Sequence, residues 1–288
     1  MKVDNAIIMA AGTSSRFAPL SYEKHKAMTI VKGEVLIERQ IKQLKESGVS
    51  DIYIVTGYKA EQFNYLTEKY GTKLIHNSEY LTRNNNGSIW AARNILANSY
   101  VCSSDNYFSV NPFESEIKES YYAAEYSDGP TSEWCMTEGE DGFIDAVTIG
   151  GTDAWYMLGH TFWSEKFSSK FIDILSAEYS LSKTADKLWE SIFVDHLDVL
   201  KMKIKRYAPN TIYEFDTLDE LRIFDKTYIT NSHSRILKKV AKEIGISEEK
   251  MIHVKSFKGI NAEAVGFEFD CPVGHYKYTY ATKHLEKT

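Results

Sequence analysis

Short apolar runs alternate with amphipathic helical patterns over the first 110 residues, and this alternation constrains the fold more than any other feature. The apolar runs cover residues 6–9, 51–56, 73–76 and 100–103, and the helical patterns cover 35–47, 59–70 and 88–96. Repeated strand–helix–strand units of this kind build a parallel sheet. We therefore predict an α/β fold with a Rossmann-like mixed, mainly parallel sheet and helices on both faces.

The pattern changes in the middle of the chain. Aromatic and β-branched residues dominate residues 121–163, where Asp141-Gly142 marks a turn, so antiparallel hairpins are expected there. Helices are predicted over 164–179, 183–200 and 218–224, and strands over 201–207 and 211–215. From residue 228 onwards, a helix over 234–243 should end at Gly245, and strands should follow over 265–270 and 276–280.

Charge divides the chain near residue 227. Residues 228–288 hold ten Lys/Arg against seven Asp/Glu, a net charge of +3, whereas the whole chain carries −6, which leaves −9 on residues 1–227. We predict one large domain over residues 1–227 and a small α+β appendage over 228–288.

Composition excludes several classes of protein. With 288 residues and 43% hydrophobic content, the chain can bury a large core without disulfides. Its three cysteines are scattered, which argues against a disulfide framework or a zinc site, and its negative charge disfavours a nucleic-acid partner. Because no secretory signal or bilayer-length apolar run is present, we expect a cytoplasmic protein that does not bind membranes.

The first apolar run leads directly into a loop that contains Gly12. Backbone N–H groups at this edge of a parallel sheet suit phosphate binding, although most such turns only reverse the chain. Arg16 lies four residues after Gly12 and Lys26 ten residues after Arg16. One loop can therefore offer backbone donors, a guanidinium and an ammonium to a single triphosphate.

The segment MAAGTSSRFAPLSYEKHKAM, residues 9–28, resembles the signature loop of the nucleoside-diphosphate-sugar pyrophosphorylase superfamily. Within that superfamily, residues 4–226 are most similar to the bacterial phosphocholine cytidylyltransferases. Further matching motifs lie at 80–88, 98–107, 132–134, 159–163, 188–190 and 212–216. Two positions depart from the signature. Ser14 replaces a glycine, and its side chain should crowd the phosphates. His25 replaces a proline, and the loss of the proline should relax the extended backbone that orients Lys26.

The resemblance implies a magnesium-dependent nucleotidyltransferase that uses CTP and a small phosphomonoester, and it assigns roles by position. The expected catalytic residues are Arg16, Lys26, Asp105 and Asp216, of which Asp105 and Asp216 would hold Mg²⁺. The expected nucleotide-binding residues are Ala10, Ala11, Gly12, Thr13, Ser14, Arg16, Lys26, Asn85 and Ser88. The expected acceptor-binding residues are Glu133, Trp134, Trp189 and Glu214. Trp134 and Trp189 would form an aromatic cage for a choline head group.

Three alternatives stay open. Leu188 stands where the family's cage has a tyrosine, which allows another phosphoamine as the acceptor. A sugar-1-phosphate nucleotidyltransferase has the same fold, and the departures at Ser14 and His25 allow a catalytically weak nucleotide-binding regulator. Residues 228–288 weakly resemble the start of a choline-kinase-like domain, chiefly at 256–261; we interpret them as a truncated remnant that could act in docking or in a homodimer.

Overall fold

The computed structural model describes residues 1–259 and 263–288, which form two compact units. The first unit comprises Met1–Gly12 and Ile37–Glu214, and the second comprises Thr13–Leu36 and Phe215–Thr288. Each unit contains a β-sheet of its own. Across the described ranges, no helix has both the length and the apolar character that a bilayer span needs.

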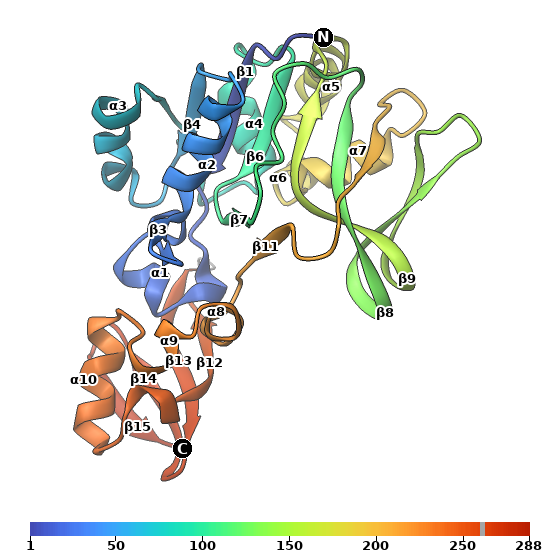
Figure 1. The fold of residues 1–288 in the computed structure, drawn as a ribbon. Coiled ribbons are helices and arrows are strands. Elements are labelled where there is room, and N and C mark those ends of the chain that lie inside the picture. The colour runs from blue at the N-terminus through green and yellow to red at the C-terminus, as the bar shows by residue number, and fades with distance from the viewer. Residues whose placement is uncertain (260–262) are drawn as a thin grey trace. The chain divides into compact units, whose positions relative to one another are not determined.

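The sheet of the first unit has the strand order β10-β8-β9-β6-β1-β4-β5 (Figure 1). Its strands are β1 (Asn5–Ala10), β4 (Ile52–Thr56), β5 (Lys73–His76), β6 (Ser99–Ser103), β8 (Tyr121–Glu138), β9 (Ile144–Trp163) and β10 (Lys203–Arg206). Strand β1 is parallel to β4 and β6, β4 to β5 and β8 to β10, whereas β9 is antiparallel to both of its neighbours. The predicted mixed, mainly parallel sheet is confirmed.

Helices flank this sheet as βαβ connections require. They are α2 (Leu36–Glu46), η3 (Ala60–Phe63), α3 (Asn64–Tyr70), α4 (Asn86–Ala92) and α5 (Glu165–Glu178). In Figure 1, α2 lies in front of the central strands and α4 lies behind them. Residues of α4 and α5, including Ile89, Phe167 and Phe171, share one buried core with Trp163 of β9.

The predicted helix over residues 183–200 is wrong. The chain forms two short helices instead, α6 (Ser182–Ala185) and α7 (Trp189–Asp195), and Leu188 between them has an extended backbone (φ −68°, ψ 152°). The buried amide of Asn86 donates to the carbonyl oxygens of Thr184 and Lys187 at 3.0 and 2.5 Å. A side chain about 100 residues away therefore takes over carbonyls that a continuous helix would use internally.

The middle of the chain forms one long hairpin, and a small ribbon lies next to it. Strands β8 and β9 pair along most of their length with several register shifts, and the predicted turn at Asp141-Gly142 connects them. The ribbon pairs β7 (Asn106–Phe108) with β11 (Ile212–Glu214) in antiparallel fashion. In this ribbon, Asn106, which directly follows Asp105, pairs with Glu214.

The second unit combines the signature segment with the C-terminal end of the chain. Its sheet has the order β12-β13-β14-β15 and is antiparallel throughout. The strands are β12 (Ile252–Lys258), β13 (Ala264–Cys271), β14 (Gly274–Thr279) and β15 (His284–Lys287). The other elements are η1 (Ser15–Phe17), α1 (Leu20–Glu23), η2 (Lys26–Met28), β2 (Ile30–Val31), β3 (Glu34–Val35), α8 (Leu218–Phe224), α9 (Thr227–Thr230), α10 (Arg235–Ile244) and η4 (Glu248–Lys250).

The C-terminal predictions are confirmed in part. Helix α10 ends at Gly245, which has the left-handed conformation expected of a helix-ending glycine (φ 75°), and β13 and β14 lie where strands were predicted. Strand β12 was missed because a register shift after Ile252, with His253 at φ 53°, interrupts the alternation of its side chains. The stretch 256–261 that supported the kinase resemblance is described only as far as Gly259. A domain boundary after residue 227 stays a prediction, and the contacts of the chain group residues 13–36 with the C-terminal end instead.

Candidate functional site

The signature loop begins where β1 ends. Ala10 and Ala11 are buried, and the carbonyl oxygen of Ala11 accepts a hydrogen bond from the Tyr58 N–H at 3.0 Å. Next to it, a Cβ on Gly57 would lie 2.8 Å from the Ala11 oxygen and 2.7 Å from Tyr80, so only glycine fits there. The exposed Gly12 follows, and a Cβ added there would have no neighbouring atom within 4 Å. The loop therefore leaves a rigid strand and exposes its backbone immediately afterwards.

Ser14 occupies the position where the family signature has its second glycine. Its backbone is left-handed, with φ 48° and ψ 44°. A non-glycine residue in this region is strained by about 1 kcal/mol, whereas glycine adopts it freely. The loop thus keeps the conformation that a glycine favours, at some cost in stability.

His25 replaces the proline of the signature, and the chain nevertheless keeps an extended backbone at this position. His25 has φ −54° and ψ 139°, close to the φ of about −65° that proline imposes. Its Nδ1 also accepts a hydrogen bond from the N–H of Ala27 at 3.1 Å, which caps η2. The extended backbone that a proline would impose is therefore present without it, and a looser orientation of Lys26 stays a prediction.

Two cations of the signature segment share one carboxylate in the second unit. The Nζ of Lys26 lies 3.1 Å from Oδ1 of Asp216, and Nη1 of Arg16 lies 2.7 Å from Oδ2 of the same residue. Lys26 is buried, with 3% of its side chain exposed, whereas the Arg16 side chain is 70% exposed. The structure therefore brings together three of the four predicted catalytic residues, with a net charge of +1.

Asp216 owes its place to the start of helix α8. Glu220 accepts hydrogen bonds from the backbone N–H groups of Asp216 (2.7 Å) and Thr217 (3.2 Å), while the Thr217 hydroxyl accepts from the Glu220 N–H at 3.2 Å. This reciprocal arrangement is a capping box, and the sequence Thr-x-x-Glu encodes it locally.

Two further acids lie together in the first unit. Asp105 occupies the turn between β6 and β7, Glu214 ends β11, and carboxylate oxygens of the two residues lie within 4.8 Å of each other. The amide of Asn106 donates to Glu214 at 3.4 Å. Glu214 was predicted to bind the acceptor, and its position beside Asp105 also makes it a candidate metal ligand. Asp216 follows Glu214 by two residues in the chain.

Asn85 connects the start of α4 with the start of α7. Its side-chain oxygen accepts the Trp189 N–H at 2.7 Å, and its amide nitrogen donates to Glu190 at 2.9 Å. Nearby, the buried Ser88 hydroxyl accepts from Asn77 at 3.3 Å. The predicted nucleotide-binding pair is therefore also part of the internal hydrogen-bond network of the first unit.

Glu190 is a functional candidate that the residue-by-residue prediction omitted. The hydroxyl of Tyr122 donates to one oxygen of the Glu190 carboxylate at 3.4 Å, and the amide of Asn85 donates to the other oxygen. Burial raises the pKa of Glu190 to about 7, although the hydrogen bonds from Asn85 and Tyr122 act in the opposite direction. The signal that could have identified Glu190 is its place in the motif at 188–190, next to Trp189.

The two predicted cage tryptophans differ in exposure. Trp134 on β8 is partly buried and packs against the core of the first unit, and the neighbouring Glu133 is exposed. Trp189 is 1% exposed, stacks on Tyr122 with ring centroids 5.7 Å apart, and contacts Trp163 edge to face at 5.0 Å. A contact of Trp189 with the acceptor stays a prediction, and its burial argues for a packing role.

Glu125 of β8 is a second residue that was missed. This buried carboxylate accepts the backbone N–H groups of Asn210, Thr211 and Ile212 at 3.2, 2.9 and 2.7 Å. These bonds fix the turn that leads into β11 and hence the position of Glu214. Sequence alone gave no signal for this role, because the partners lie 85 to 87 residues away.

Comparison with known proteins identifies the family. Residues 6–108 match the MobA-like NTP transferase domain. The chain is 34% identical over 217 residues to the choline-phosphate cytidylyltransferase of Streptococcus pneumoniae, an alignment that covers 75% of this chain and 95% of that protein. The chain belongs to the choline-phosphate cytidylyltransferase family. The members of this family are nucleotidyltransferases, as the signature loop indicated.

A further relative and a solved structure support this assignment. The 2-aminoethylphosphonate cytidylyltransferase of Lancefieldella rimae is 32% identical over 229 residues, with 78% of this chain and 93% of that protein covered. A solved structure of the CTP:phosphocholine cytidylyltransferase from Streptococcus pneumoniae superposes with a TM-score of 0.75 at 33% identity, covering 79% of this chain and 99% of that one. About a fifth of this chain therefore has no counterpart in that member of the cytidylyltransferase family.

Proposed function

We propose that the protein transfers a cytidylyl group from CTP to phosphocholine or a similar phosphoamine, forming the CDP-alcohol and pyrophosphate. Similarity to the choline-phosphate cytidylyltransferases over three quarters of the chain supports the reaction. The observation that carries the proposal for the site is the pairing of both Lys26 and Arg16 with Asp216. These two cations carry the charge that a bound triphosphate needs.

The reaction needs no side-chain nucleophile. A phosphate oxygen of the acceptor, which is largely ionised near neutral pH because its second pKa is about 6, attacks the α-phosphorus of CTP. The bond between this phosphorus and the bridging oxygen breaks, and pyrophosphate leaves with the electron pair. Arg16 and Lys26 stabilise the charge that develops on the phosphates, and the loop backbone orients them.

Magnesium is the proposed cofactor, and the acids present fit its chemistry. Asp105 and Glu214 offer carboxylate oxygens within 4.8 Å of each other, and Mg²⁺ prefers such oxygen ligands together with substrate phosphates. We propose Asp105 and Asp216 as its ligands, with Glu214 beside them. When bound, the ion would neutralise the triphosphate and the leaving group. Lys26 and Arg16, which pair with Asp216 in the structure, would bind the phosphates of the nucleotide.

Acids and aromatic rings of the first unit favour a cationic acceptor. Glu133 and Glu214 supply negative charge, and Trp134 supplies a ring that is only partly covered by its neighbours. A cation gains about 0.5–2 kcal/mol from each such ring, depending on its desolvation. We propose that these residues bind the ammonium group of the acceptor. A cytoplasmic location, the lack of nucleic-acid and membrane partners, and a homodimer stay predictions.

A pyrophosphate-release assay tests the function directly. Four nucleoside triphosphates are each combined with phosphocholine, phosphoethanolamine, 2-aminoethylphosphonate and a set of sugar 1-phosphates. We expect turnover with CTP and one of the amine-bearing acceptors. Turnover with sugar 1-phosphates alone would contradict the proposal, and tight CTP binding without turnover on any acceptor would support a regulator instead.

A further inference from the structure

We propose that the C-terminal segment, residues 225–288, positions the signature loop for nucleotide binding, with Glu23 and Arg222 as positioning residues. The inference rests on the proposed role of this loop in binding CTP. It replaces the interpretation of residues 228–288 as a kinase remnant with a function in the reaction itself. Its basis is a set of contacts within the second unit, which joins residues 13–36 to residues 215–288.

The first contact links helix α1 of the signature segment to helix α10. The carboxylate of Glu23 accepts the backbone N–H groups of Arg235 and Ile236, each at 3.0 Å, and a hydrogen bond from the Ser234 hydroxyl. These are the free donors at the N-terminus of α10, where negative charge is favoured. The N-terminus of α10 is thus capped by a residue three positions before Lys26.

A second contact, also made by a residue that precedes Lys26 in the sequence, is aromatic. The ring of Tyr22 stacks on that of Tyr280, with centroids 3.7 Å apart and planes inclined by 13°. Tyr280 follows β14 and is buried, whereas 42% of Tyr22 is exposed. Tyr22 and Glu23 together tie the chain before Lys26 to two elements of the C-terminal segment.

The chain after Lys26 is tied in the same way. The backbone N–H of Lys32 donates to Asp225 at 2.7 Å, and the hydroxyl of Tyr228 donates to the carbonyl oxygen of Ile30, also at 2.7 Å. Lys26 therefore lies between two anchors, and the C-terminal segment supplies the partner residues of both. A loop fixed at both ends loses less conformational entropy when it binds a ligand.

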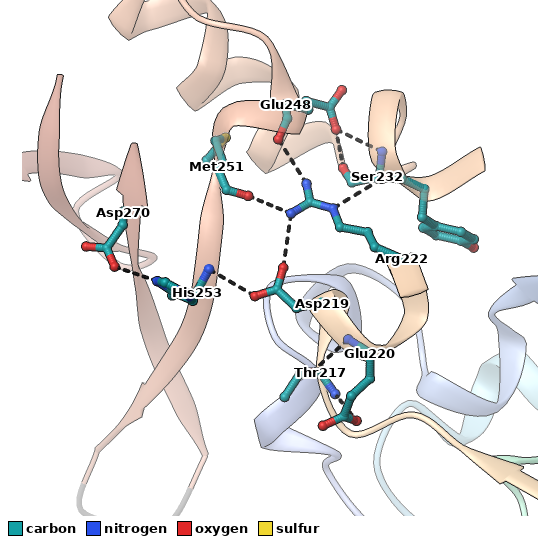
Figure 2. A network of polar contacts seen from close by, with 10 residues as sticks. Thr217, Asp219, Glu220, Arg222, Ser232, Glu248, Met251, His253 and Asp270 are labelled. Carbon is teal, nitrogen blue, oxygen red and sulfur yellow. Dashed lines mark hydrogen bonds and ion pairs between the residues drawn. The ribbon is translucent and has the colours of Figure 1, made fainter. Parts of the chain in front are cut away.

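A further set of contacts fixes Asp216, the carboxylate that pairs with Lys26. In Figure 2, the buried guanidinium of Arg222 in helix α8 reaches the carbonyl oxygens of Met251 (2.5 Å) and Glu248 (2.9 Å). It also pairs with Asp219 at 3.2 Å, and Asp219 accepts the His253 N–H at 2.9 Å. Helix α8 begins with the capping box that holds Asp216, so Arg222 connects this acid to the C-terminal sheet.

The test uses the full-length protein with Glu23→Ala, which removes the carboxylate that accepts the N–H groups of Arg235 and Ile236, leaves the Ser234 cap of α10 in place and does not alter Lys26. We expect amide hydrogen exchange of residues 13–28 to accelerate about tenfold, and the KM for CTP to rise about three- to tenfold, as the loss of these hydrogen bonds implies. The KM for the acceptor should change less than twofold. Glu23→Gln keeps one acceptor oxygen and should give intermediate values.

A matched control separates positioning from general loosening of the C-terminal sheet. His275 contacts Asp270 at 2.7 Å and Glu268 at 3.8 Å, both on the same sheet, so His275→Gln should leave loop exchange and both KM values unchanged. If Glu23→Ala fails to fold, Tyr22→Ala at the more exposed position tests the same coupling. Unchanged exchange of residues 13–28 in the folded variant would overturn the inference.

The two proposals can fail separately. Faster loop exchange together with weaker CTP binding, measured by calorimetry, supports both. Faster loop exchange with unchanged CTP affinity supports the coupling and contradicts the proposed nucleotide-binding role of the loop. An equal rise of both KM values would overturn the inference, because positioning of the signature loop should affect the nucleotide first.

Discussion

Lys26 and Asp216 lie 3.1 Å apart, Nζ to Oδ1, although 190 residues separate them in the chain. Lys26 is buried, and a buried ammonium needs a partner because its desolvation is costly. Asp216 provides that partner and is shared with the exposed Arg16. Asp216 therefore holds both cations next to the signature loop. We propose that the triphosphate of CTP takes the place of this carboxylate when it binds.

Replacing Lys26 by alanine should lower kcat by about 10²- to 10³-fold, because preorganised charge on the phosphates is lost from the transition state. Lys26→Arg keeps the charge but changes its geometry and should retain part of the activity. Lys24→Ala, at an exposed position two residues earlier, serves as the control with near-normal turnover. Near-normal turnover of Lys26→Ala would remove the assignment.

Asp105→Asn and Asp216→Asn should each raise the magnesium concentration needed for half-maximal rate, and the double variant should abolish activity. Asp128→Asn, at an exposed position on β8, controls for the change in net charge. The measurement is the initial rate over a magnesium titration at saturating CTP. Unchanged magnesium curves for both single variants would contradict these ligands and point to Glu214 instead.

Trp134→Ala and Trp189→Ala should have different consequences. Trp134→Ala should raise the acceptor KM about 2- to 30-fold with little change in the KM for CTP, since one ring of a cage is lost. Trp189→Ala removes a ring that is 1% exposed and should lower the free energy of unfolding by about 3–5 kcal/mol. Acceptor kinetics and urea unfolding of both variants test this. A stable Trp189→Ala with a raised acceptor KM would return Trp189 to the cage.

Local sequence signals predicted most of the first unit. Apolar runs such as residues 6–9 and 51–56 became neighbouring parallel strands, and the Gly12 loop lies at their carboxyl edge. In the second unit, Gly245 was equally informative, because it marked the end of α10. These features depend on residues that are close in sequence, so a pattern can encode them.

Long-range contacts produced what the sequence did not predict. Asn86 interrupts the expected helix by binding the carbonyls of Thr184 and Lys187. Glu125 accepts hydrogen bonds from three backbone N–H groups of a distant turn. Glu23 accepts a backbone N–H group at the start of a helix that begins more than 200 residues later. Each contact joins groups whose proximity exists only after folding, so no periodicity or motif records it.

Ser14→Gly should raise the free energy of unfolding by about 0.5–1 kcal/mol. Glycine relieves the strain of the left-handed backbone at φ 48°, although it also raises the entropy of the unfolded chain. Ser14→Ala keeps the strain and should give no gain, which makes it the matched control. Urea unfolding measures both, and equal stability of the two variants would show that the backbone at Ser14 is not strained.

The half-buried Glu190 should make stability fall as the pH rises from about 4.5 to 7. An unfolded glutamate releases its proton near pH 4.5, whereas burial raises the pKa of Glu190 in the folded protein to about 7, so the folded state binds more protons in this window. The loss should amount to about 2–3 kcal/mol, with allowance for partial exposure.

The difference between the wild type and Glu190→Gln isolates this effect. His160 acts in the opposite direction: burial lowers its pKa to about 3, so its contribution grows as the pH rises from about 3 to 6.5 in both proteins. Urea unfolding at pH 4.5, 6 and 8 should therefore show Glu190→Gln gaining on the wild type as the pH increases. A constant difference across this range would mean that Glu190 is ionised in the folded protein throughout.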